Sequence, residues 1–241
     1  MSRNLDFPGR TVITSFLSCE KTLARVLDVV PWCHDHESVW SPVLTTVIME
    51  ACTQLDSLWG YEAWQSECVR KKKKRTQLNI KDYFEYFGSI VSKRWVVFWG
   101  GDPVSVHPFE SWRDQADFSN LAWWDVYNKL KHDRLEHKEM ANLSTAVNAL
   151  AGLFLAILAC EHCRYAVEAA GWLSAAESVS HNPKASLGED STSIKDYYVL
   201  AETILFSYPV GWCNSEINQG DDWRGDASFR FKQWFWDYPG V

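Results

Sequence analysis

The chain has 241 residues and a formal net charge of −7, so its bulk charge excludes general polyanion binding, and any nucleic-acid contact must come from a local patch. Its 46% hydrophobic and 23% charged residues are ordinary for a globular protein, and the length is sufficient to bury a full core. Aromatic residues reach 15%, which favours core packing first and recognition of bases or partner surfaces second.

Cysteine usage favours a reducing compartment, and the hydropathy pattern favours neither a secretory signal nor a membrane span. Seven cysteines are spread along the chain without a disulfide-like framework, so we expect reduced thiols and a cytoplasmic protein. The N-terminal MSRNLDFPGR is polar and lacks the apolar segment of a secretory signal. The most apolar run, ALAGLFLAILAC, is shorter than the ~20 residues of a membrane span. We interpret it as a buried core helix rather than a membrane-spanning one, and expect no membrane partner.

The first half of the chain has apolar residues at helical spacing. This spacing predicts a first helix within residues 11–30. Ser41 as N-cap and Pro42 at the first helical position predict the start of a second, the clearest amphipathic helix in the chain. Asn79 predicts the cap of a shorter helix that Gly88 would end.

The second half begins with RWVVFWGGDPVSVHPF (94–109), whose β-branched run and Gly-Gly-Asp-Pro turn predict a β-hairpin insert. A helix is predicted next, running as far as Leu135, and then another over 139–172. The Ser-, Asn- and Gly-rich segment 178–193 predicts a loop. Beyond it, ETILFSYPVGWC and SFRFKQWFWDYP favour either strands of a small β-appendage or irregular packing over the core.

These elements predict a mainly α fold: a helical bundle with a small β-hairpin insert and an aromatic-rich C-terminal appendage. We divide the chain into an N-terminal helix and loop (1–39), a helical core (40–177) and a C-terminal loop and appendage (178–241). The C-terminal region is a candidate surface for a protein partner.

One stretch, WWDVYNKLKHDR (123–134), concentrates chemically versatile side chains. On a helix, Asn128 and His132 share a face, and Tyr127, Lys131 and Arg134 line the adjoining strip. Imidazole can move protons near neutral pH, and the cations can hold a phosphate and its developing charge. The alternative is a packing helix whose tryptophans face the core and whose charges form ordinary pairs four residues apart.

At these residues the chain resembles a known superfamily. YNKLKHDR, followed by ANLSTAVNALAGLF, is similar to the motif region of HEPN-type all-helical domains, and the resemblance covers residues 40–172. That superfamily includes prokaryotic endoribonucleases of toxin–antitoxin, antiviral defence and CRISPR-linked systems. His132 matches the motif histidine and Asn128 the polar position. Tyr127 stands where the family has arginine, and Arg134 would restore a guanidinium two helical turns away.

The resemblance implies a homodimer that cuts RNA without a metal or other cofactor. In that reading His132 transfers protons, Asn128 positions the substrate, and Lys131 and Arg134 stabilise phosphate charge. Because Tyr127 departs from the motif, a second hypothesis stays open. It is a non-catalytic HEPN-like module that dimerises or binds a partner.

A run of six cations, RKKKKR, is the second constellation. It predicts salt-sensitive binding to RNA phosphates, with a nuclear import signal or a solvated loop as the alternatives. The candidate RNA-binding residues are Arg70, Lys71, Lys72, Lys73, Lys74 and Arg75.

Two groups of metal-capable residues are weaker. The segment 33–37 (CHDHE) would need a distant fourth ligand such as Cys68 or His107. Cys160, His162 and Cys163 lie on a predicted helix, where His162 would leave the face that the two cysteines share. The sequence therefore predicts no metal site.

Overall fold

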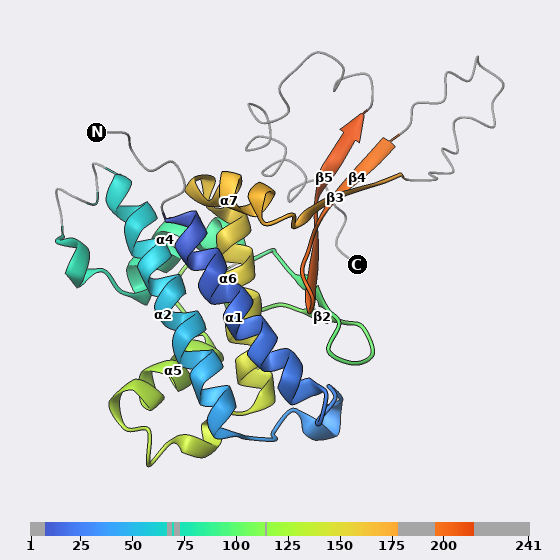
Figure 1. Ribbon diagram of the computed structural model, residues 1–241. Helices are drawn as coiled ribbons and strands as arrows, with labels where there is room; N and C mark the ends of the chain where they lie inside the picture. Colours follow the sequence, from blue (N-terminus) through green and yellow to red (C-terminus); the bar gives the residue numbers. More distant parts are fainter. Residues whose placement is uncertain (1–7, 67–68, 70–72, 114, 178–195, 215–241) are drawn as a thin grey trace. The chain divides into compact units, whose positions relative to one another are not determined.

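The computed structural model describes residues 8–66, 69, 73–113, 115–177 and 196–214 (Figure 1). Its secondary structure is mainly helical with a small antiparallel sheet component, which confirms the predicted fold class at that level. The chain divides into two compact units: residues 1–170 with 204–206, and residues 171–203 with 207–241.

The first unit is a helical bundle. Its α-helices are α1 (Gly9–Leu27), α2 (Pro42–Gln65), α4 (Ile80–Val91), α5 (Ala122–His132), α6 (Leu143–Ala159) and α7 (Arg164–Ala169). Short 3-10 helices are η1 (His34–His36), η2 (Arg75–Gln77), η3 (Glu110–Trp112), η4 (Lys138–Met140) and η5 (Glu161–Cys163). The long helices α1, α2 and α6 lie side by side, and α4 and α5 pack against both α2 and α6 (Figure 1).

Helix α6 is the centre of this bundle. Every residue of its apolar run from Ala149 to Leu158 is buried, which confirms its interpretation as a core helix. Within the described part of the chain, no helix is both long and apolar enough to cross a bilayer.

The aromatic residues are used mainly as core. Trp59 on α2 is buried, and its ring centroid lies 5.3 Å from Phe87, 5.5 Å from Phe109 and 6.0 Å from Trp112. Such offset ring pairs add stabilisation beyond the area that they bury. The expectation that aromatic enrichment serves packing first is confirmed for this cluster.

The helices α2 and α4 start at their predicted N-cap residues, whereas the predicted ends of α4 and α6 are wrong. The Ser41 hydroxyl accepts a hydrogen bond from the Val43 N–H, and the Asn79 side chain accepts one from Lys81 N–H, as the capping pattern predicts. The predicted end of α4 at Gly88 is wrong, because the helix continues to Val91. Gly88 is buried inside the helix, and the Ser92 N–H bonds back to its carbonyl.

The predicted continuous helix over 139–172 is also wrong. It starts later, at Leu143, where the Asn142 side chain caps it by accepting from Thr145 N–H. The helix then stops at Ala159, and Cys160 adopts an extended conformation with φ −89° and ψ 118°. Helices η5 and α7 follow this break, so the chain changes direction at Cys160.

The predicted hairpin insert is confirmed. Strands β1 (Val96–Phe98) and β2 (Val104–Val106) pair antiparallel, with Val97 opposite Ser105. Leu205 joins this first unit from far along the sequence: its N–H donates to the buried Glu20 carboxylate at 2.9 Å, and its carbonyl accepts from Trp99 N–H.

The second unit contains strands β3 (Leu173–Glu177), β4 (Asp196–Glu202) and β5 (Phe206–Asn214). β4 pairs antiparallel with both neighbours, with an irregular register at Val199 and Leu200 on the β5 side. From Phe206 onward, the segment ETILFSYPVGWC therefore forms a strand, as one of the two interpretations predicted, and residues 203–205 connect it to β4. The loop 178–193 and the segment SFRFKQWFWDYP lie outside the described residues.

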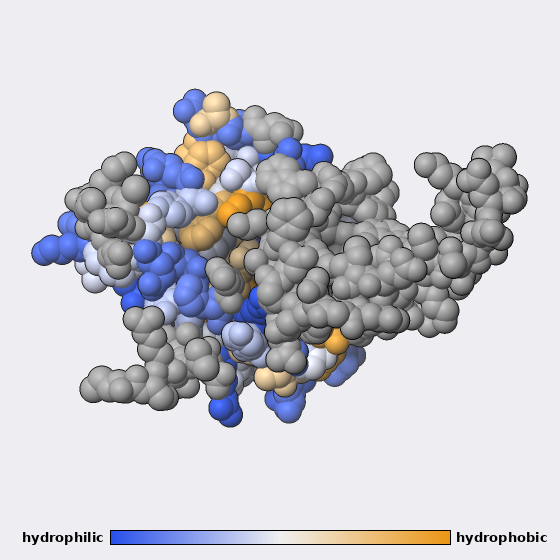
Figure 2. Space-filling view, turned by 90° about the horizontal axis from the view of Figure 1, so that it is seen from above, coloured by the Kyte–Doolittle hydropathy of each residue, from blue (hydrophilic) through white to orange (hydrophobic). Residues whose placement is uncertain are grey.

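The surface seen from above is mixed. Figure 2 shows hydrophilic residues over much of the coloured surface, with smaller apolar areas between them. Among the described residues, large apolar side chains that reach solvent include Leu135, 87% exposed, and Val29, 80% exposed. Leu135 lies next to the predicted site in sequence.

Candidate functional site

Helix α5 carries the predicted site, and its inner face is firmly packed. Trp123, Trp124, Tyr127 and Leu130 are buried, and the Trp123 ring N–H donates to the Pro108 carbonyl at 2.7 Å. The tryptophans therefore belong to the core, as predicted, and they fix the rotation of the helix. The opposite face and the C-terminal end of α5 are left toward solvent.

The polar side of α5 presents part of the predicted constellation. Asn128 is half-buried one turn before His132, which is exposed at the last position of the helix. Lys131 is exposed, and its ammonium lies 5.4 Å from the Tyr127 ring centroid. Lys129 pairs with Asp125 at 2.8 Å, as the packing interpretation expects.

Two parts of the predicted geometry are wrong. Arg134 does not lie two helical turns from Tyr127, because α5 ends at His132 and the chain turns away at Asp133, with φ −145°. Leu135 is also beyond the helix. Tyr127 is buried to 2% exposure, so it holds the helix in the core and does not reach a substrate on the surface.

The turn after α5 keeps its charged groups near His132. The Asp133 side chain accepts from Glu136 N–H at 3.1 Å, which stabilises the turn. Arg134 is exposed, and among the described residues neither its guanidinium nor the His132 ring has a partner in an ion pair or hydrogen bond. The end of α5 therefore offers an imidazole and two cations to solvent.

The basic run is only partly within the described residues, since Arg70, Lys71 and Lys72 lie outside them. Two of the others hold the fold together. Lys73 pairs with Asp82, while the Arg75 guanidinium lies 5.8 Å from the Tyr61 ring centroid. Both are therefore committed to contacts within the first unit.

The fold does not bring this run beside His132. Arg75 contacts α2 near its C-terminal end, where it donates to the Ser57 carbonyl at 3.5 Å. The turn after α5 lies at the other end of α2, where the Lys138 ammonium is 5.9 Å from the Trp40 ring (Figure 1). Lys74 is exposed and remains the candidate phosphate contact there.

The segment 33–37 satisfies its polar groups locally. His34 lies 3.5 Å from Glu37, and the His36 ring bonds to the Pro31 carbonyl at 2.7 Å. His107, considered as its distant partner, instead lies 3.4 Å from Glu110, and Cys68 is outside the described residues. These residues do not form a metal-binding group in the described part of the chain.

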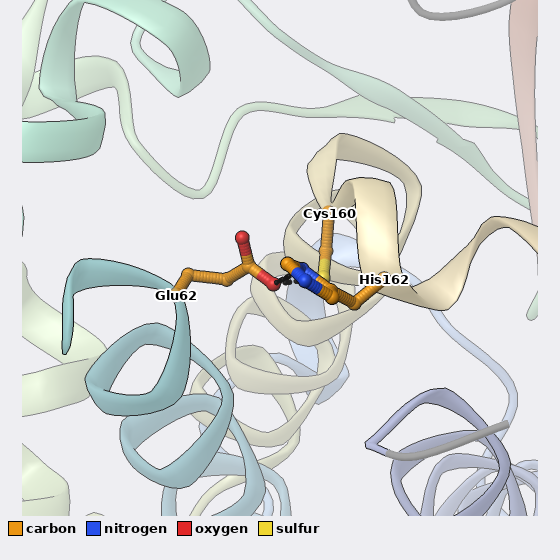
Figure 3. A group of neighbouring side chains, drawn as sticks. All are labelled: Glu62, Cys160 and His162. Atoms are coloured by element: carbon orange, nitrogen blue, oxygen red, sulfur yellow. Dashed lines mark hydrogen bonds and ion pairs between the residues drawn. The ribbon is translucent and has the colours of Figure 1, made fainter. Parts of the chain in front are cut away.

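A different group was missed by the sequence prediction: Glu62, Cys160 and His162 (Figure 3). Glu62 comes from the end of α2, Cys160 from the break after α6, and His162 from η5. A hydrogen bond with Cys163, burial and the Glu62 charge raise the pKa of the Cys160 thiol well above its ordinary value. The CEHC spacing was the available signal, and assuming a continuous helix concealed it.

Two open cavities border other polar side chains of the first unit. One, of about 230 Å³, is lined in part by His107, Glu110 and Asn148. The other, of about 430 Å³, lies between α1 and α2 and is lined by hydroxyl groups together with Glu50. Neither cavity includes His132. The end of α5 is exposed at the protein surface.

No protein-family model matches this chain, and neither the curated proteins nor the solved structures contain a match. Function is therefore inferred from the side chains that the fold exposes and brings together. Two places qualify: the end of α5, and the break after α6.

Proposed function

We propose that the protein is an HEPN-like RNA-targeting protein of a prokaryotic defence or toxin system, acting as a metal-independent endoribonuclease at the end of α5. The observation that carries the proposal is the exposure of His132 beside two exposed cations, Lys131 and Arg134. A buried His132 would have been incompatible with RNA cleavage there.

The chemistry follows from these side chains. His132 accepts the proton of a ribose 2′-hydroxyl while that oxygen attacks the adjacent phosphorus, and the 5′-oxygen leaves. Lys131 and Arg134 stabilise the negative charge that develops on the phosphate oxygens. Asn128, half-buried one turn earlier, positions the substrate by hydrogen bonding. The products carry a 2′,3′-cyclic phosphate and a 5′-hydroxyl.

A second copy of the chain completes the proposed site. One exposed imidazole can serve as base, and protonation of the leaving oxygen needs a second acidic group, which a facing His132 supplies. A phosphate contact by Lys74, at the other end of α2, would hold a longer RNA by charge alone. The active form we propose is therefore a homodimer.

The test is incubation of the purified protein with total RNA in EDTA, alongside His132→Ala. Cleavage by the unmodified protein and its loss in His132→Ala support the proposal. His34→Ala is the matched control, because that imidazole is also highly exposed and lies outside the site. Equal cleavage by His132→Ala, or none by the unmodified protein, refutes a nuclease at this position.

The alternative is a non-catalytic HEPN-like module that dimerises or binds a protein. Two observations favour it: Arg134 is not on the helix where the motif needs a guanidinium, and Leu135 is 87% exposed beside it. An interface that covered Leu135 would remove this side chain from water. A dimer that Leu135→Asp dissociates, together with absent cleavage and absent RNA retention, identifies this alternative.

A further inference from the structure

Three side chains converge on one small volume at the end of the first unit's central helices. The Glu62 Oε1 atom accepts hydrogen bonds from the Cys160 thiol at 2.9 Å and from His162 Nδ1 at 2.6 Å (Figure 3). The Glu62 oxygen, the Cys160 sulfur and the His162 nitrogen, each a possible metal-ligand atom, all lie within 4.8 Å of one another. Cys160 and His162, which follow Glu62 by 98 and 100 residues in the sequence, are thus joined through one oxygen atom.

The backbone builds this convergence. Because α6 stops at Ala159 and Cys160 is extended, His162 returns beside Cys160 and does not continue around a helix. Helix α1 holds the turn in place: a Cβ atom at Gly9 would lie 2.9 Å from the Cys163 Cα and 3.1 Å from the His162 carbonyl oxygen. This close approach requires glycine, so the turn that carries His162 is fixed by tertiary packing.

The geometry excludes a nucleophilic relay. In such a relay the imidazole stands between the thiol and the carboxylate, since it must take the proton from sulfur. Here the carboxylate oxygen stands between the other two groups and contacts both. The arrangement instead places a sulfur, a nitrogen and an oxygen around a common centre.

We propose that Cys160 Sγ, His162 Nδ1 and Glu62 Oε1 bind a zinc-class divalent ion, with the fourth position open to solvent. Thiolate, imidazole and carboxylate are the protein ligands of zinc, and three of them with an open position is an established coordination pattern. Tetrahedral zinc holds these atoms roughly 3.2–3.6 Å apart. Glu62 Oε1 therefore needs to separate by less than about 1 Å from each of the other two atoms, while Cys160 Sγ and His162 Nδ1, which lie within 4.8 Å of each other, need to approach by at most about 1.5 Å.

Burial is graded as such a site requires. Cys160 is 7% exposed, the Glu62 side chain 17% and the His162 side chain 40%, so one side of the group is open. On binding, the ion takes the place of the two protons that Glu62 now accepts: the thiol proton and the His162 Nδ1 proton leave to solvent, and the bound neutral imidazole carries its proton on Nε2. The buried Cys163 lies beside Cys160, and their interaction raises the pKa of the free Cys160 thiol, so the ion itself must stabilise the thiolate.

The experiment is titration of the full-length, EDTA-treated and desalted protein with Zn²⁺ against a chromophoric chelator, and with Co²⁺ by absorption spectroscopy. We expect one equivalent of Zn²⁺ and a cobalt–thiolate charge-transfer band. Cys160→Ala should abolish the band, and either Cys160→Ala or His162→Ala should weaken Zn²⁺ binding by at least about 100-fold. Glu62→Gln, which keeps side-chain volume, should weaken it in the same direction.

The matched controls are Cys33→Ser and His34→Ala, which remove an exposed thiol and an exposed imidazole from the segment 33–37. Both should keep one equivalent and the cobalt band. Binding of less than one tenth of an equivalent, or a cobalt band that survives Cys160→Ala in a folded protein, overturns the proposal. So does a Cys160–Cys163 disulfide in the protein as isolated under reducing conditions, detected by a mass lower by two hydrogens.

Discussion

The end of α5 and the break after α6 use similar side chains in opposite ways. At the end of α5, His132 and its neighbouring cations are adjacent in sequence, lie exposed, and make no contact with one another that holds them in place. After α6, His162 and Cys160 meet a carboxylate from α2, about a hundred residues away. The first arrangement fits the proposed binding of a large polyanion such as RNA, because its side chains are not held together by contacts of their own. The second fits the proposed binding of a small ion, because its three side chains already converge.

The largest expected effect is on RNA cleavage at the end of α5. His132→Ala should lower RNA cleavage by about 100- to 10,000-fold, because general acid–base catalysis contributes that much. Single-turnover cleavage of a labelled RNA in EDTA measures the rate. His162→Ala serves as the counterpart from the other region and should leave the rate unchanged. A loss in both variants would mean that the two regions act as one site.

Tyr127 separates packing from chemistry within α5. Tyr127→Ala should lower the free energy of unfolding by about 3 kcal/mol, since it removes a fully buried ring that contacts Trp124 at 5.1 Å between centroids. Tyr127→Phe keeps the ring and should retain both stability and RNA cleavage. Denaturant titration and the cleavage assay measure the pair. A Phe variant that is stable yet inactive would return Tyr127 to the catalytic group.

The break after α6 should respond to metal, and the end of α5 should not. At a free Zn²⁺ concentration of 100 times its Kd, the unmodified protein should gain about 2.7 kcal/mol in free energy of unfolding. Cys160→Ala should gain at most about 0.4 kcal/mol, because its Kd is at least about 100-fold higher, and His132→Ala should gain as much as the unmodified protein. Thermal unfolding with and without Zn²⁺ makes the measurement. Equal stabilisation of Cys160→Ala would place the ion elsewhere.

Local signals predicted the fold well where a side chain acts on its own backbone. Ser41 and Asn79 start their helices because a side-chain oxygen accepts an N–H two residues on, and this depends on sequence alone. The ends of α5 and α6 have no such signal, since neither His132 nor Ala159 is followed by glycine or proline. The turn after α5 is stabilised by the Asp133 side chain, and the turn after α6 by its close packing against Gly9, which the local pattern does not encode.

The same reason explains which site residues could be found. Asn128, Lys131 and His132 share one helix, so helical spacing placed them correctly, while Arg134 was misplaced because the predicted helix was too long. Glu62 was missed because its partners are 98 and 100 residues away. Finding it needs the packing of α2 against α6, not a motif.

Tyr83 on α4, which bonds to Asp56 on α2, provides a stability test that is independent of both sites. Its hydroxyl donates to the Asp56 carboxylate at 2.7 Å, and Tyr83→Phe should cost about 1–2 kcal/mol. Burial, followed by the Asp56 charge, raises the pKa of Tyr83 above its ordinary value. The stabilisation is therefore full below the unfolded pKa of about 10 and is lost as pH rises from there through the folded pKa. Urea titrations of both proteins at pH 8 and above pH 10 test it; a constant difference would contradict it.

The smallest effect distinguishes two lysines on α5, Lys129 and Lys131, which are two residues apart. Lys129 is neutralised by Asp125 at 2.8 Å, whereas Lys131 is exposed beside His132. If RNA lies at this end of the helix, Lys131→Ala should weaken binding and reduce the slope of log K against log salt by about 0.7, the value for one phosphate contact on a single strand. Lys129→Ala should leave the slope unchanged, because its charge is already paired. Filter binding over a salt series measures both, and equal slopes for the two variants would move the RNA away from His132.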